Sequence, residues 1–239
     1  MKYLICSLIA VLAIPVCGQE KEAVVIPRET QNVNGWTVRV DKRLLDGGDL
    51  YEKVGKTAIA LLGADLTRIS ILMPEKQLGE MRKVVIVVDE HPNLKGAQYH
   101  PSKGWLVDNG HEASLAKCVH VSRASTYANP DHAFVQPSMI LHELAHGYHD
   151  QVLDFEFPPI KKAFARAQLQ GQYKEVLFVK GGKRRHYALS NHKEYFAEAT
   201  EAYFGTNDFY PFVRAELKEH DPALFTELEK IWGAATKKK

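Results

Sequence analysis

Apolar positions change their spacing along this chain of 239 residues. Up to about residue 122 they fall in short runs or alternate with polar residues, which predicts strands; after it they recur every three or four residues, which predicts helices. The predicted strands are residues 36–40, 84–88, 105–107 and 116–121, with a further apolar, β-branched run at 69–72. The predicted helices are residues 51–62 (ending at Gly63), 138–153, 160–170, 192–204 and 222–234, with a hairpin of residues 176–179 and 185–189 around Gly181-Gly182. Strands followed by helices predict an α+β fold, with a small mixed sheet in the N-terminal half packed on one helix and a mainly helical C-terminal half.

The N-terminus has the pattern of a secretory signal peptide over residues 1–18. Lys2 precedes an apolar run, and Cys17-Gly18 precede a polar stretch, which predicts cleavage before Gln19 and a secreted or periplasmic protein. Acylation of Cys17, as in a lipoprotein, is the alternative, although Val16 is larger than the residue usual before such a cysteine. Residues 19–45 are then an N-terminal extension, loose and polar up to residue 35, and residues 46–239 are the functional domain.

Composition narrows the class of protein further. The chain is 45% apolar and 25% charged, which is ordinary for a globular domain with a packed core. The formal net charge is +2, and +1 once Lys2 is removed, so nothing points to nucleic acid or to a membrane surface after signal removal. Cys118 is the one cysteine outside the predicted signal, and its apolar neighbours predict a buried thiol. We expect a monomer.

The predicted helix over residues 138–153 carries the sequence His142-Glu143-Leu144-Ala145-His146. Its two histidines lie one turn apart on one face, so their imidazoles project in parallel, as two corners of a tetrahedral zinc site require. Glu143 follows the first histidine and lies close to the same ion. Zinc lowers the pKa of water from about 15.7 to about 7, so a neighbouring carboxylate can remove a proton at neutral pH. The motif predicts one catalytic Zn²⁺ per chain with Glu143 as general base.

Catalytic zinc sites usually have three protein ligands and one open position. Val152 occupies the position at which metzincins carry a third histidine, which excludes that pattern. In the predicted helix over 192–204, Glu194, Glu198 and Glu201 recur at i, i+4 and i+7 and form one carboxylate face. We expect at least one to bind the metal and another to accept the free ring N–H of a ligand histidine.

The residues alone leave the choice among these three carboxylates open. Glu194 could instead close a capping box with Asn191, three residues earlier. Gly205-Thr206-Asn207-Asp208 also resembles the Gly-Thr-x-x-Asp sequence of the aspzincins, but its aspartate comes one residue early and follows a helix end.

His142-Glu143-x-x-His146 followed by Glu194-Tyr195-Phe196-Ala197-Glu198 resembles the gluzincins, zinc peptidases whose third ligand is a glutamate. The chain is most similar to the catalytic domain of anthrax lethal factor and the related secreted Pro-Pro endopeptidases. In that group a tyrosine seven residues before the ligand glutamate lies over the metal, and Tyr187 occupies that position. The 47 residues between His146 and Glu194 also suit this group. The resemblance covers roughly residues 80–210 and rests on these motifs.

The resemblance implies a zincin-like fold and assigns roles to single residues. It implies His142, His146 and Glu194 as zinc ligands. It implies Glu143 as base, Tyr187 as donor to the developing oxyanion, and Glu198 as the partner of a ligand histidine. It also implies that a sheet edge near Tyr99 and Trp105 pairs with an extended peptide or protein substrate.

These patterns predict a secreted zinc-dependent endopeptidase. One alternative is an exported zinc-binding protein without turnover, although a purely structural site has no need of Glu143. A second is a zinc hydrolase of a non-peptide amide. His149 and Asp150 are either outer partners of the site or a solvated pair. Residues 183–185, Lys-Arg-Arg, are either a solvated hairpin tip or a contact for acidic substrate side chains.

Overall fold

A five-stranded sheet forms the base of the N-terminal half in the computed structural model, which describes residues 23–233. The strands are β1 (Arg28–Val33), β2 (Trp36–Asp41), β3 (Val85–Val88), β4 (Ala97–Tyr99) and β5 (Cys118–Val121). Their order is β1-β2-β3-β5-β4. The inner pairs β2–β3 and β3–β5 are parallel, whereas β1 and β4 pair antiparallel at the two edges. The predicted mixed sheet is confirmed; the predicted signal peptide lies outside the described residues.

The two faces of the sheet pack against different layers. Side chains alternate between the faces, so Ile86, Val88, Val119 and Val121 point into the main core beneath the helices. The intervening Val87 and Cys118 point the other way, into a small cluster under α4 (Lys103–Asp108) and the 3₁₀ turn Ala113–Leu115. The buried thiol predicted at Cys118 is confirmed.

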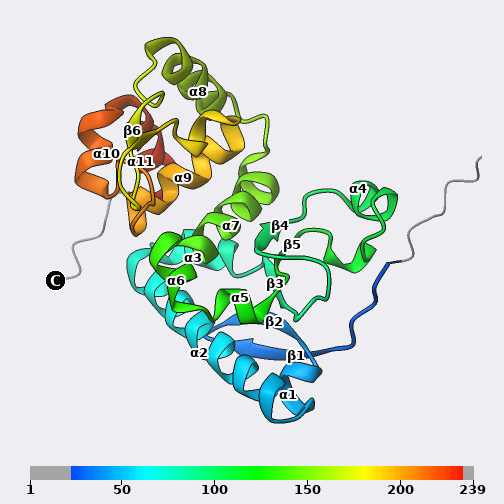
Figure 1. Cartoon of the computed structure of the whole chain (residues 1–239). Coiled ribbons are helices and arrows are strands. Elements are labelled where there is room, and N and C mark those ends of the chain that lie inside the picture. The colour runs from blue at the N-terminus through cyan, green and yellow to red at the C-terminus, as the bar shows by residue number, and fades with distance from the viewer. Residues whose placement is uncertain (1–22, 234–239) are drawn as a thin grey trace, which may run out of the picture.

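Helices make up most of the rest. They are α1 (Arg43–Asp46), α2 (Asp49–Leu72), α3 (Glu75–Met81), α5 (Ala124–Tyr127), α6 (Pro130–Val135), α7 (Met139–Tyr148), α8 (Pro158–Gln170), α9 (His192–Phe204), α10 (Arg214–His220) and α11 (Pro222–Trp232). A π-helical segment, His149–Leu153, continues α7. The short strands β6 (Val176–Leu177) and β7 (Lys183–Arg184) form a hairpin around Gly181-Gly182 as predicted, although its second strand comes before the predicted residues 185–189. Figure 1 shows α8 to α11 gathered above the sheet, with α7 leading from one half to the other.

Local signals explain the elements that were predicted correctly. α9 has the predicted bounds because the Asn191 side chain accepts the backbone N–H groups of Lys193 and Glu194 at its start and Gly205 follows its end. α11 begins as predicted, with Asp221 accepting the Leu224 N–H and Pro222 in the first turn. Within residues 23–233 no helix is both long and apolar enough to cross a membrane.

The predicted stop at Gly63 and the strand-like run at 69–72 are wrong, because α2 continues to Leu72. Leu62, Leu66 and Ile69 are buried at helical spacing and extend the apolar face of the first half. The helix ends instead before Pro74, which forces Met73 into an extended conformation.

Two further predicted strands are wrong. Trp105 lies in the short helix α4, whose first turn is capped by the Ser102 hydroxyl accepting the Trp105 N–H at 3.2 Å. Residues 185–189 contain the 3₁₀ turn Tyr187–Leu189, capped by the His186 ring, which accepts the Ala188 N–H. In both segments a side-chain cap sets the backbone, and apolar content alone does not reveal it.

The described part of the expected N-terminal extension is not loose, because β1 and β2 are integral strands of the sheet. The Arg28 guanidinium, 8% exposed, donates to both oxygens of Asp89 at 2.7 and 2.8 Å and to Glu112. His120 lies 2.8 Å from the same Asp89 carboxylate, which is fully buried. A charged network therefore ties β1 to β5 and to Asp89, the residue that follows β3.

Arg28→Ala should lower the free energy of unfolding by about 3–5 kcal/mol, because it leaves the buried Asp89 carboxylate without its main cationic partner. Urea denaturation followed by circular dichroism measures the change. Glu29→Ala, at an exposed position of the same strand, is the matched control and should change it by less than about 0.5 kcal/mol. Equal stability of the two variants would mean that β1 unfolds independently of the sheet.

Candidate metal centre and its cleft

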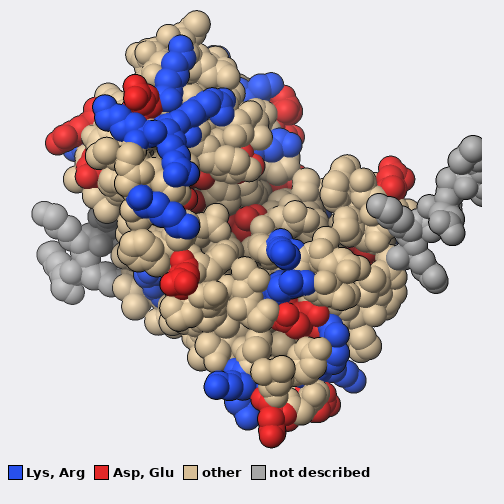
Figure 2. All heavy atoms as spheres, viewed as in Figure 1, with Lys and Arg blue, Asp and Glu red and all other residues tan. Residues whose placement is uncertain are grey.

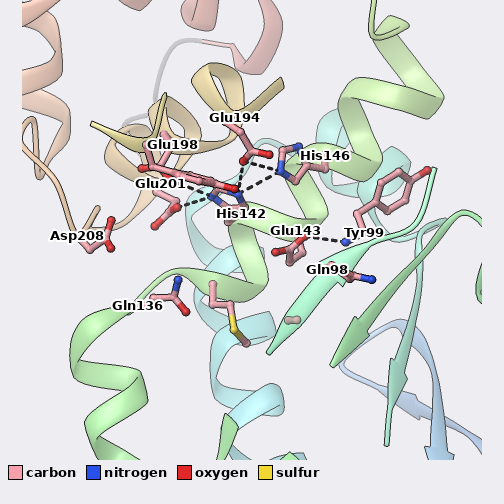
Figure 3. A pocket seen from close by; sticks show the side chains of 13 residues that line it. Gln98, Tyr99, Gln136, His142, Glu143, His146, Glu194, Glu198, Glu201 and Asp208 are labelled. Atoms are coloured by element: carbon pink, nitrogen blue, oxygen red, sulfur yellow. Dashed lines mark hydrogen bonds and ion pairs between the residues drawn. The ribbon is translucent and has the colours of Figure 1, made fainter. Parts of the chain in front are cut away.

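Three side chains from two helices converge on one point. His142 Nε2 and His146 Nε2, both from α7, lie 3.1 Å apart. Glu194 Oε2, from the first turn of α9, lies 3.1 Å from the first and 3.2 Å from the second. Figure 3 shows the three groups facing one another across the gap between the helices. The sequence pattern did not place the two helices side by side; the packing of α7 on α9 does so.

Local structure on each helix aims these side chains. Gly147 allows α7 to lie close to the sheet, since a Cβ atom there would come within 2.9 Å of Val84 Cγ2. On α9, Asn191 caps the helix through its own side chain and receives the Glu194 backbone N–H at 3.0 Å. The Glu194 carboxylate does not return to the cap, as the capping-box alternative required, and is directed at the two imidazoles.

The three atoms have the chemistry and the spacing of a metal site. A tetrahedral ion with bonds of about 2.0–2.1 Å holds its ligand atoms about 3.3–3.4 Å apart, close to the separations found here. Two imidazole nitrogens and a carboxylate oxygen are also ligands that zinc accepts. Without a cation, only a shared proton can hold such acceptors together. Burial lowers the pKa of His142, but its hydrogen bonds to Glu194 and Glu201 raise it well above the ordinary value.

The carboxylate that supports His142 is Glu201 rather than the predicted Glu198. Glu201 Oε1 lies 2.6 Å from His142 Nδ1, whereas Glu198 Oε1 is 3.9 Å away. An Nδ1–H donated to Glu201 leaves the Nε2 lone pair directed at the gap. Glu198 instead accepts the Asn207 amide at 2.8 Å, and burial and the neighbouring Glu201 raise its pKa well above the ordinary value. The sequence placed Glu201 on the same face of the helix as Glu194 and Glu198. Which of these carboxylates reaches His142 depends on how α7 and α9 cross.

Glu143 lies beside the ligand triad, between it and the edge of the sheet. Its Oε2 accepts the backbone N–H of Tyr99, in the edge strand β4, at 2.7 Å. The Tyr99 hydroxyl in turn donates to Asp150 Oδ2 at 2.6 Å, seven residues further along the same helical segment. The edge strand is therefore fastened to this helical segment at two points, and the Glu143 carboxylate has a fixed place beside the gap.

These groups line one cleft of about 370 Å³. Besides the residues named above, Ala97, Gln98, Gln136, Met139, Tyr187 and Asp208 contribute to its walls. Tyr187 is half exposed there, and burial, then the Glu194 carboxylate, raises the pKa of its phenol. Asp208 lies beyond Glu201 (Figure 3), and burial raises its pKa to about 7. Asp208 is therefore a wall of the cleft and is not among the grouped metal-ligating side chains, contrary to the aspzincin alternative.

The remaining sequence candidates have other roles. His149 is fully buried among Phe155, Phe196 and His192, with no hydrogen-bond partner on either ring nitrogen. Burial, with His192 nearby, lowers its pKa to about 3. It is therefore neither solvated nor bonded to the site. Trp105 lies in α4, where it stacks on His111, and is not part of the sheet edge. Tyr99 is part of that edge.

Comparisons with protein-family models, with curated proteins and with solved structures find no match to this chain.

Alanine variants distinguish the proposed metal ligand Glu194 from the carboxylates near it. Glu194→Ala should abolish one-to-one binding of Zn²⁺, because it removes one of the three converging atoms. Glu201→Ala should weaken binding about 10–100-fold, because His142 loses the acceptor that orients its ring. Glu198→Ala should have a smaller effect. Zn²⁺ titration against a competing chelator measures all three, and circular dichroism checks folding.

Glu219→Ala, at an exposed position on α10, is the control. Full binding by Glu194→Ala, with loss in Glu198→Ala, would contradict the assignment.

Proposed function

We propose that this protein is an exported zinc-dependent endopeptidase. The observation that carries the proposal is the convergence of His142 Nε2, His146 Nε2 and Glu194 Oε2 within 3.1–3.2 Å, with Glu143 beside them in an open cleft. Zinc bound there would supply a Lewis acid that polarises the scissile carbonyl and makes water acidic enough to lose a proton near neutral pH.

Glu143 is the group that takes and returns this proton. Its carboxylate is held by the Tyr99 N–H at 2.7 Å, a bond that fixes one oxygen and leaves the other free to accept. Because Glu143 directly follows His142 on α7, it is next to the ligands without being one of them. A purely structural metal site has no use for a carboxylate in this position.

Tyr187 supplies a hydrogen-bond donor in the wall of the cleft. It lines the same cleft, and its side chain is 50% exposed. Its raised pKa keeps the phenol protonated at neutral pH, so that it can donate a hydrogen bond to the oxygen that becomes negative during attack on an amide.

The edge strand β4 supplies a docking line for an extended peptide. His100 donates to the Cys118 carbonyl and Ser122 to the Gly96 carbonyl, so residues 96, 98 and 100 face β5. The Ala97 N–H and the carbonyls of Ala97 and Tyr99 therefore face the cleft, while the Tyr99 N–H is taken by Glu143. They favour a peptide substrate over a small amide, because a main chain can pair with them.

We also propose that the fold is zincin-like and that the protein is similar to the lethal-factor type of gluzincin. The support for both is the arrangement of a mixed sheet with an antiparallel edge strand, a helix carrying the two histidines beside that edge, and a second helix carrying the glutamate. Export rests on the sequence of residues 1–18.

Glu143→Ala should lower kcat/KM about 10²–10⁴-fold, because the proton acceptor is lost, while one zinc per chain remains bound. The measurement is a digest of an unbiased peptide library by purified protein, with metal content determined on the same samples. Glu75→Ala, at an exposed position on α3, is the control and should cleave normally. Absence of cleavage by the zinc-loaded wild type would sink the peptidase proposal.

Tyr187→Phe should reduce kcat about 10²–10³-fold with little change in zinc content, because it removes one donor to the developing negative charge. Steady-state kinetics on a peptide found in the library digest measures it. Tyr51→Phe, at an exposed position on α2, controls for loss of a phenol elsewhere. A change in KM alone would show that Tyr187 binds the ground state rather than the transition state.

A further inference from the structure

The segment that leads into Tyr187 carries the strongest local excess of positive charge among the described residues near the cleft. Residues 171–187 contain a single acidic side chain, Glu175, and five exposed cationic ones: Lys174, Lys180, Lys183, Arg184 and Arg185. Figure 2 shows Lys and Arg gathered over the upper part of the molecule, where Figure 1 places β6, and acidic side chains in the hollow below.

These cations are uncompensated. Within residues 23–233 none of the five forms an ion pair. Some lysines elsewhere pair with a carboxylate close along the chain, as Lys56, Lys83, Lys161 and Lys230 do, and others do not. This segment differs in that five unpaired cations follow one another with one acidic residue among them, so it presents a positive field to an approaching ligand.

The hairpin is held firmly at the rim of the cleft. The Phe178 N–H donates to the Gly182 carbonyl at 3.1 Å, and the Val179 N–H donates to the carbonyl of Asp208, a cleft residue, at 2.8 Å. Phe178 also packs on Phe209 with ring centroids 4.8 Å apart, and Arg184 lies over the Phe178 ring at 4.4 Å. The hairpin is therefore tied to two residues that line the cleft: it contacts Asp208 directly, and Tyr187 follows three residues after β7.

The cleft itself has the opposite charge. Five carboxylates line it, and no lysine or arginine does. An extended peptide advances about 3.3 Å per residue, so a chain bound at the ligand triad and leaving past Tyr187 passes the hairpin a few residues from the triad. We propose that the basic hairpin selects peptide substrates carrying acidic residues about three to five positions from the cleaved bond, on the one side that passes over it.

This inference rests on the proposed peptidase function and is tested on a neutral parent peptide taken from the library digest. Two Glu residues are placed three to five positions from the cleaved bond, on the N-terminal side in one peptide and on the C-terminal side in another; a third set carries Lys. One of the two Glu peptides should show kcat/KM about 3–10-fold above the parent at 50 mM NaCl, through KM, because each exposed charge contact contributes modestly. The gain should shrink at 500 mM NaCl.

Lys180→Glu/Lys183→Glu should bring the ratio of Glu peptide to parent down to about one or below. The control is Lys42→Glu/Lys53→Glu, which makes the same change in net charge at two exposed positions. Lys42 directly precedes α1 and Lys53 lies on α2, at the opposite end of the molecule in Figure 1. This variant should keep the wild-type ratio of Glu peptide to parent. Loss of the ratio in both double variants would show a bulk-charge effect and overturn the proposal, as would equal cleavage of all peptides by the wild type.

The two failures remain distinguishable. If the wild type does not cleave the parent, the peptidase function is wrong; if it cleaves the parent without preference, only the role of the hairpin is wrong. Fluorescence anisotropy of labelled Glu peptide with Glu143→Gln supplies a readout without turnover. The Glu peptide should bind Glu143→Gln about 3–10-fold more tightly than it binds the triple variant Glu143→Gln/Lys180→Glu/Lys183→Glu.

Discussion

Between α7 and α9, two imidazole nitrogens and a carboxylate oxygen come within 3.1–3.2 Å of one another, and the arrangement is stable only with positive charge among them. This constraint organises the middle of the protein. α7 is held to the sheet through the glycine after its second histidine, and α9 is aimed by its asparagine cap. A cation at this point would also tie together residues 142 and 194, which belong to the two halves of the fold. Metal affinity and tertiary stability are then linked quantities.

Around that point the carboxylates have separate tasks because their surroundings differ. Glu194 faces the imidazoles, Glu201 orients one ring, Glu198 accepts an amide from Asn207, and Glu143 is held by the edge strand. Burial keeps the pKa of Glu198 and of Asp208 raised, so the acidic lining is less negative than its composition suggests. The basic hairpin at the rim adds a field of the opposite sign. The position of an acidic residue along a bound peptide therefore matters as much as the total charge of that peptide.

Much of this was accessible from sequence, for identifiable reasons. The bounds of α9 followed from Asn191 and Gly205, and the His142–His146 spacing predicted two imidazoles on one face of a helix. Part of what failed depended on contacts distant in sequence: Gly63 lies inside α2 because buried side chains beyond it continue the helical face. β1 is different, because it pairs along its length with β2 through the two-residue turn Asn34-Gly35, a local hairpin signal that the prediction from sequence missed. Three glutamates on one face were visible, but which of them meets a ring nitrogen is decided by how two helices cross.

The bond between the Tyr99 N–H and Glu143 has a consequence for the solubility of the protein. β4 is an edge strand, and an exposed edge is a template on which another copy of the same chain can add a strand. Here the strand is only three residues long, and one of its outward donors is already used by a buried carboxylate of the protein itself. A second sheet edge approaching it would meet the Glu143 carboxylate and one outward N–H, that of Ala97, which is enough to hold a single peptide but too little for a ladder between two sheets. The residue placed to handle a proton thus also protects the sheet against aggregation.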